Sequence, residues 1–296
     1  MLIKIDHKTT YRYSDNVFLE PHIIRLIPRT NFSQQVIEKN IMIDPVPVRM
    51  TQITDQNNAD AYLVWFTHMT RSLSIHSSIT VETREFNPFD FIIYPNSGQK
   101  LPLPYTHMEL LVLKPYLQPL AGAGMITDFA EKMAEHVQWS TIAFLTELAQ
   151  FVQNEFQYES RLEATQQSPE VTFGNKKGSC RDFVLFCMAV CRHLNIASRF
   201  VTGYYFSDEP DDNKATHAWM EVYLPGGGWK GYDPTHGIAC YERHVTLSTS
   251  SEPQLTSPIS GTYRGFANSH MTVELSLSNI SSERIDSPQL ASQLKS

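Results

Sequence analysis

Residues 178–200, GSCRDFVLFCMAVCRHLNIASRF, place a cysteine directly after Gly-Ser at the start of a long apolar run. The pattern predicts a helix that begins at Cys180. Cysteine caps a helix poorly, but a helix N-terminus stabilises a thiolate, and its N–H groups can receive an oxyanion. A catalytic nucleophile is therefore one explanation of Cys180. The other is core packing, which we expect for Cys187 and Cys191 on the same helix face.

The second informative stretch is residues 216–237, THAWMEVYLPGGGWKGYDPTHG. Alternating patterns flank the Leu-Pro-Gly-Gly-Gly segment, which predicts a β-hairpin with a tight turn. If the loop holds an odd number of residues, His217 and Asp233 share one face, directly opposite or one diagonal step apart. A diagonal separation of about 7–8 Å still allows an imidazole–carboxylate hydrogen bond. Cys180, His217 and Asp233 can then supply a nucleophile, a base and a residue that orients the base.

Each of these residues also has a simpler explanation. A histidine on a strand is more often a surface residue, and an aspartate before proline is more often a turn cap. The conjunction of all three favours a catalytic triad over separate structural roles. Two neighbours are expected to support the site. Asp182 stabilises the helix N-terminus electrostatically. Trp219, on the same strand face as His217, either shields the groove or packs as an aromatic residue against the sheet. We interpret His236, three residues after Asp233, as a decoy that is not the catalytic base.

The chain divides into regions of different pattern. Residues 1–95 alternate in period two and predict an antiparallel β domain. Residues 96–124, rich in Pro and Gly, predict a wrapping connection without a helix. Residues 125–280 predict a core of helices and strands with a closing β segment, and residues 281–296 a disordered tail. The core is expected to contain helices at 128–137, capped by Thr127 or Asp128, and at 141–156, and strands at 197–206, 217–224, 229–233, 240–247 and 270–277.

Composition and charge exclude several classes of protein. A net charge of −7, from 24 basic and 31 acidic residues, argues against a nucleic-acid partner. The start has no signal-peptide pattern, and the longest apolar run, residues 183–191, is too short for a membrane span, so we expect a cytoplasmic protein with no membrane partner. Four cysteines are too few for a disulfide scaffold, and no zinc or calcium motif is present, so neither a metal nor a cofactor is expected.

Four segments together resemble the transglutaminase-like superfamily of cysteine enzymes: GSCRDF, SRFVTGYYF, HAW-x-EVYLPGGGW and YDPT. The opening TYRYS, RLIPR and IDPVPV resemble the N-terminal region of bacterial members, and SPISGTYRG with MTVELSL resembles their closing segment. The resemblance implies an α+β fold with a papain-like core, in which the nucleophile helix packs on an antiparallel sheet. It also implies that the nucleophile is Cys180, the base His217 and the orienting carboxylate Asp233.

The implied function is a peptide or amide hydrolase that works through a thioester on Cys180. Transfer of the acyl group to an amine is the alternative, and a non-enzymatic binding scaffold of the same fold is a third possibility. The chain departs from the family pattern in two places. Ala215-Thr216 precedes His217 where many members have Asp-Ala, and SEPQLTSP, residues 251–258, stands where relatives often have Gly-Arg-Asp-Tyr. The substrate class is a peptide or amide, and no oligomeric state is implied.

Overall fold

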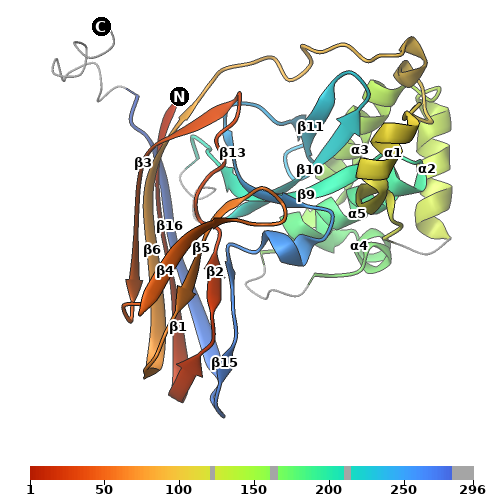
Figure 1. The fold of residues 1–296 in the computed structure, drawn as a ribbon. Coiled ribbons are helices and arrows are strands. Elements are labelled where there is room, and N and C mark those ends of the chain that lie inside the picture. The colour runs from red at the N-terminus through yellow and green to blue at the C-terminus, as the bar shows by residue number, and fades with distance from the viewer. Residues whose placement is uncertain (121–123, 161–165, 210–214, 282–296) are drawn as a thin grey trace, which may run out of the picture.

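The computed structural model describes residues 1–120, 124–160, 166–209 and 215–281 and has the α+β architecture that the sequence predicts. Figure 1 shows a β-rich part beside a part in which helices pack against a further sheet. The predicted tail, 281–296, lies outside the described residues except for its first residue.

In the described chain the β-rich part is a sandwich of two antiparallel sheets. One sheet has the order β15-β1-β6-β3, with β16 also paired to β1, and the other has the order β14-β2-β5-β4. Apolar residues from both sheets, among them Val17, Val64 and Leu73, form a buried cluster between them. The strands of this part are β1 (Leu2–Leu19), β2 (His22–Ile24), β3 (Gln34–Asp44), β4 (Arg49–Thr54), β5 (Asp60–Trp65), β6 (Met69–Thr83), β14 (Ile259–Ser260), β15 (Tyr263–Arg264) and β16 (Ser269–Asn279).

The closing β segment joins this sandwich, whereas the sequence analysis assigned it to the core. The strand expected at 270–277 is present as β16, but it pairs with β1 from Ile3 opposite Asn279 to Tyr13 opposite Ser269. The physical reason is that a strand as long as β1 needs partners for its backbone groups on both edges, and β6 occupies only one of them. The first and last described strands are therefore neighbours.

The other part contains the helices and the sheet on which they pack. In this sheet the strand order is β12-β11-β10-β9-β13, and every pairing is antiparallel. The elements are η1 (Asn96–Gln99), α1 (His107–Leu113), η2 (Lys114–Leu117), α2 (Met125–His136), α3 (Thr141–Glu155), α4 (Pro169–Asn175), α5 (Cys180–His193), β9 (Ser198–Tyr205), β10 (His217–Leu224), β11 (Gly228–Asp233), β12 (Ile238–Ala239), β13 (His244–Ser250) and η4 (Pro253–Thr256), with a short parallel pair of β7 (Gln157–Tyr158) and β8 (Lys177–Gly178).

Several expected element bounds differ from the structure. The helix expected at 141–156 is confirmed as α3, which follows Ser140. The helix expected at 128–137 is present as α2, but it begins at Met125, before both expected caps. The Gly124 N–H donates to the Thr127 hydroxyl (3.0 Å), which starts the helix early. The strand expected from 240 begins only at His244 as β13.

The absence of a helix in 96–124 was a wrong prediction. A helix, α1, follows Thr106, whose hydroxyl accepts a hydrogen bond from the Glu109 N–H (3.3 Å) while the Glu109 carboxylate accepts one from the Thr106 N–H (2.8 Å). This reciprocal cap satisfies donors that a short helix otherwise leaves open. The Pro-rich surroundings obscured it in the sequence.

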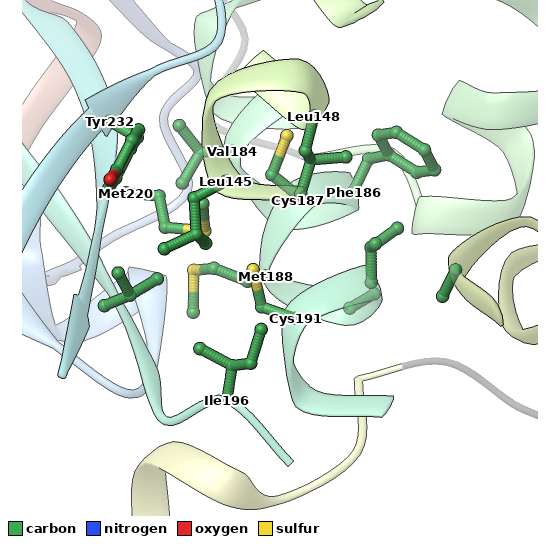
Figure 2. Close-up of a cluster of buried hydrophobic side chains, with 14 of the residues drawn as sticks. Leu145, Leu148, Val184, Phe186, Cys187, Met188, Cys191, Ile196, Met220 and Tyr232 are labelled. Atoms are coloured by element: carbon green, nitrogen blue, oxygen red, sulfur yellow. The ribbon is translucent and has the colours of Figure 1, made fainter. Parts of the chain in front are cut away.

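Helix α5 is the centre of the largest buried cluster. Its apolar side chains meet those of α3 and of β10, where Ala218, Met220, Val222 and Leu224 all face the cluster. Figure 2 shows the contact region, in which Cys187 and Cys191 lie among Leu145, Leu148, Val184, Phe186, Met188, Ile196, Met220 and Tyr232. Cys187 and Cys191 have no exposed surface, so their prediction as core residues is confirmed.

The N-terminal sandwich packs against the β9–β13 edge of the core sheet. Apolar residues of β1, β6 and β16 form a second shared cluster with Tyr204, Phe206, Val245 and Leu247. The buried His7 ring also hydrogen-bonds the Tyr204 hydroxyl (2.8 Å), and burial lowers the pKa of His7 to about 4, so that the ring is neutral. The sandwich and the core sheet thus share a buried interface.

A buried ion pair should hold the sandwich to its C-terminal strands. Arg25 Nε donates to the Asp55 carboxylate (2.7 Å), and Arg25 also donates to the Ser257 carbonyl and the Ser260 hydroxyl. Replacing Arg25 by Leu leaves a buried carboxylate without its cation, and the free energy of unfolding should fall by about 3–5 kcal/mol in urea titrations.

The matched control is Arg71→Leu. Arg71 pairs with Asp15 at a site where both side chains are about two-thirds exposed, so the loss should stay within about 1 kcal/mol. The double change Arg25→Leu with Asp55→Leu should recover part of the loss. Equal effects of Arg25→Leu and Arg71→Leu would contradict the assignment.

Candidate active site

The cap of helix α5 is Ser179, and Cys180 is the first residue of the helix. The Ser179 N–H and hydroxyl both donate to Oδ2 of Asp182 (2.7 and 2.8 Å), and the Ser179 carbonyl accepts the N–H groups of Asp182 and Phe183. The sequence analysis weighed Cys180 against better caps, but serine already fills that position. Cys180 is therefore not needed as the cap. It is 7% exposed and lies at the positive end of the helix dipole.

Asp182 is a structural anchor of the helix start. It has no exposed surface, and besides the two Ser179 contacts its Oδ1 accepts a hydrogen bond from the Gln167 N–H (2.8 Å). Gly178 is required beside it, because a Cβ there would lie 2.8 Å from the Asp182 Cβ. The expected stabilisation of the helix end by Asp182 thus takes the form of direct hydrogen bonds to the segment that precedes Cys180.

The hairpin brings His217 and Asp233 together as its register requires. Met220 pairs with Tyr232 and Leu224 with Gly228, which leaves a three-residue loop and puts Asp233 one diagonal step from His217. His217 Nε2 lies 2.7 Å from Asp233 Oδ2. The predicted diagonal contact is therefore present. Ala218 and Met220 of β10 and Tyr232 of β11 face the α5 cluster. Because successive side chains of a strand alternate between the two faces of the sheet, His217 and Asp233 lie on the opposite face, at the end of their strands.

Cys180 reaches the same imidazole. Its side chain interacts with the His217 ring and, after Asp233, helps to raise the pKa of that ring. Because Nε2 of His217 points at Asp233, the ring nitrogen left for Cys180 is Nδ1. The three residues predicted from the sequence are thus connected in the order Cys180, His217, Asp233.

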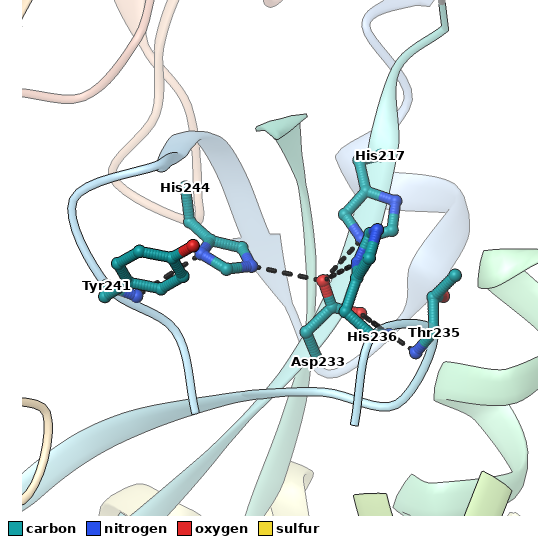
Figure 3. Close-up of polar contacts among 6 residues, drawn as sticks. All are labelled: His217, Asp233, Thr235, His236, Tyr241 and His244. Atoms are coloured by element: carbon teal, nitrogen blue, oxygen red, sulfur yellow. Dashed lines mark hydrogen bonds and ion pairs between the residues drawn. The ribbon is translucent and has the colours of Figure 1, made fainter. Parts of the chain in front are cut away.

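Asp233 also binds two histidines that the sequence analysis did not include. His236 Nδ1 lies 2.8 Å and His244 Nε2 3.1 Å from the same Oδ2, while Oδ1 accepts hydrogen bonds from the N–H groups of Thr235 (2.9 Å) and His236 (3.4 Å). Figure 3 shows the three imidazoles converging on the carboxylate. The turn after β11 brings the His236 ring back over Asp233. That His236 is not itself the base stays a prediction.

The protonation state of His244 follows from its contacts. Its Nδ1 accepts a hydrogen bond from the Tyr241 N–H (3.3 Å), so the proton is on Nε2 and points at Asp233. Burial lowers the pKa of His244, and the attraction of Asp233 does not reverse that effect. His244 is therefore a neutral donor that holds the carboxylate without adding charge.

In the pair of His217 and Asp233, unlike in His244, the partners outweigh the effect of burial on the pKa values. Burial by itself disfavours both charges, but the His217 ring and the hydrogen bonds from His217, His236 and His244 outweigh it and hold the pKa of Asp233 well below its usual range. At His217 burial is likewise outweighed, first by Asp233 and then by Cys180, which raises its pKa to about 10. At neutral pH the pair is an imidazolium against a carboxylate.

The other thiols are in a different environment. Burial raises the pKa of Cys187, Cys191 and Cys240, so all three are held as thiols. A buried thiol is a poor nucleophile. Among the cysteines, Cys180 alone has both a helix start and an imidazole.

Aromatic rings enclose the histidines. Trp219 is 1% exposed and meets His217 and His244 with ring centroids 6.1 and 5.2 Å away. Gly203 makes room for it, since a Cβ there would lie 2.5 Å from the Trp219 ring. On the other side, Tyr205 packs against His236 at 4.2 Å.

Comparison with known proteins shows the family to which this fold belongs. Residues 127–234 match the transglutaminase-like superfamily core, and residues 3–82 match the bacterial transglutaminase-like N-terminal region. The chain therefore belongs to the transglutaminase-like superfamily. Among the described residues, no helix is long and apolar enough to cross a membrane.

Individual relatives are distant but extend over most of the chain. An uncharacterized protein of Mycobacterium tuberculosis is 25% identical over 280 residues, covering 87% of this chain and 86% of that protein. One of Mycobacterium leprae is 22% identical, covering 94% and 99%. The crystal structure of a candidate cysteine protease from Cytophaga hutchinsonii superposes with a TM-score of 0.71 at 21% identity over 94% of this chain and 91% of the other. This likeness confirms the predicted fold.

The raised pKa of His217 can be measured by NMR titration of its ring. We expect the ring to stay protonated well above its ordinary value of 6.5, up to about pH 10. Asp233→Asn should lower this pKa more than Cys180→Ala does, because Asp233 is the stronger of the two stabilising partners. A larger effect of Cys180→Ala would contradict this order.

The same shift has a consequence for stability. Since the pKa of His217 is raised in the folded state, its contribution to the free energy of unfolding is complete below pH 6.5 and is lost as the pH rises towards about 10.

Proposed function

We propose that this protein is a cysteine-dependent peptide or amide hydrolase. The observation that supports this most directly is the connected series Cys180–His217–Asp233, in which the imidazole lies between the side chain at a helix start and a buried carboxylate. These are the parts that nucleophilic catalysis of acyl transfer requires. The cysteine protease description of the Cytophaga hutchinsonii protein points to the same class of reaction.

The first half of the proposed reaction forms a thioester. The Cys180 thiolate attacks the amide carbonyl carbon, and the oxyanion is received by first-turn N–H groups of α5, that of Cys180 itself included. The His217 imidazolium then donates its proton to the leaving nitrogen as the C–N bond breaks. Asp233 keeps the ring oriented and stabilises its charge throughout.

The second half returns the enzyme to its starting state. Neutral His217 takes a proton from a water molecule, whose oxygen attacks the thioester carbonyl. The C–S bond breaks, the carboxylic acid leaves, and the thiolate–imidazolium pair is restored. An amine in place of the water would make the enzyme a transferase. The product would then be a new amide, which an assay has to detect separately.

Variants of the three residues should lose activity in a defined order. Cys180→Ala should abolish the release of new amino termini from a peptide library, and His217→Ala should cost nearly as much, because triad members act as a unit. Asp233→Asn should leave a residual rate, since it disturbs the orientation of the base without removing it. A fluorescent primary amine in the same assay reports acyl transfer.

The matched control is Cys187→Ala on the same helix. It removes a fully buried thiol and should lower the free energy of unfolding by about 1–2 kcal/mol while activity is retained. Wild-type protein that turns over no member of a broad peptide and amine library, with Cys180 no more reactive to iodoacetamide than a free thiol, would favour a binding scaffold instead.

A further inference from the structure

A simple triad needs one imidazole on its carboxylate, and this site has a second one within reach of solvent. The donor atoms of His217, Asp233 and His236 all lie within 4.8 Å of one another. Both ring nitrogens approach the same Oδ2, at 2.7 and 2.8 Å. His236 transfers no proton in the reaction proposed above. Its hydrogen bond helps to hold Asp233 ionised, and its position beside Asp233 allows a second role.

Two imidazole nitrogens and one carboxylate oxygen are a donor set that suits Zn²⁺. Zinc binds such ligands at about 2.0–2.2 Å and accepts three protein ligands with an open fourth position. Tetrahedral ligands at those bond lengths lie about 3.4 Å apart. The two N–O spacings, 2.7 and 2.8 Å, are therefore about 0.6–0.7 Å shorter, as expected of ligands that hydrogen bonds hold together until an ion replaces the two bridging protons.

The surroundings of the three ligands are those of a metal site. Ligating carboxylates in such sites are themselves hydrogen-bonded, and the outer partners fix the ligand orientation. Here His244 donates to Asp233 from one side and the Thr235 N–H from another, and the Tyr205 ring packs against His236. None of these contacts would have to break for an ion to enter.

An ion can approach from the side of His236. The His236 side chain is 29% exposed and that of His217 11%, whereas Asp233 is wholly covered. The charges are also suitable, because the buried carboxylate would keep a cation as its partner in place of an imidazolium.

We propose that His217, Asp233 and His236 form a Zn²⁺ site that switches the triad off. The ion would take Nε2 of His217 and the carboxylate that orients the ring. The bound ring would carry its proton on Nδ1, so it could not accept a proton from Cys180 or from water. Cys180, which faces the other ring nitrogen, would not be a ligand. This distinguishes the site from the ordinary inhibition of thiol enzymes by metals bound to the thiolate.

The test measures metal affinity in the Cys180→Ala protein, so its outcome does not depend on whether the proposed hydrolase activity is correct. Zn²⁺ is titrated by calorimetry, and Co²⁺ by visible absorbance, which reports tetrahedral coordination. We expect Cys180→Ala to bind Zn²⁺ as tightly as wild type, with one equivalent per chain. Adding His236→Gln should weaken binding at least about tenfold.

The matched control is His193→Gln in the same background. His193 is 30% exposed and contacts Glu131, so it resembles His236 in exposure and has a carboxylate neighbour. Its loss should leave the affinity within about twofold of the parent. His236→Asn, which keeps a small polar group, serves as a second variant if circular dichroism shows that the glutamine variant is misfolded.

Two results would overturn the proposal. Binding that disappears with Cys180→Ala would show that the thiol is a ligand. Binding that is unchanged by both His236 substitutions would show that any ion is held elsewhere on the chain.

Discussion

A carboxylate with no exposed surface is the constraint around which the site is built. An isolated buried charge of this kind costs several kcal/mol, and in practice it is protonated or supplied with partners. Asp233 has five: three imidazoles on one oxygen and two N–H groups on the other. To bring them together, the hairpin register, the turn after β11 and the position of β13 all have to be correct at once. His217 is then charged at neutral pH because its partners in this arrangement, above all Asp233, raise its pKa.

The position of Cys180, the proposed nucleophile, depends on a separate set of contacts. Ser179 and Asp182 cap α5, and the interior of that helix is the centre of the largest apolar cluster. Cys180 is thus held by a rigid helix and His217 by a sheet, and the two meet only because α5 packs on β10. Rigid elements position reacting groups more precisely than loops do.

Local sequence pattern was enough to predict the helix start and the hairpin of the site. Contacts that depend on the pairing of distant strands could not be predicted. The helix start, the hairpin and the diagonal contact of His217 with Asp233 are consequences of periodicity and loop length, which can be counted in a sequence. His244 could not be found in this way, because it reaches Asp233 through the order of strands in a sheet. The same holds for β16, whose alternation is identical whichever sheet it joins. The Ser179-x-x-Asp182 spacing, by contrast, was readable as a cap and was overlooked.

Because β1 pairs with β16, one edge of β1 stays unpaired during most of the synthesis of these residues. Strand β1 is made first and its outer neighbour last, with the whole core between them. A ribosome-bound chain therefore carries a long strand with one unsatisfied edge until residue 279 has emerged, and such edges invite pairing with other chains. Folding from the N-terminus onwards, the usual course for domains during translation, cannot complete this sandwich. Its closure must wait until β16 has emerged, when the core that it will border is already present.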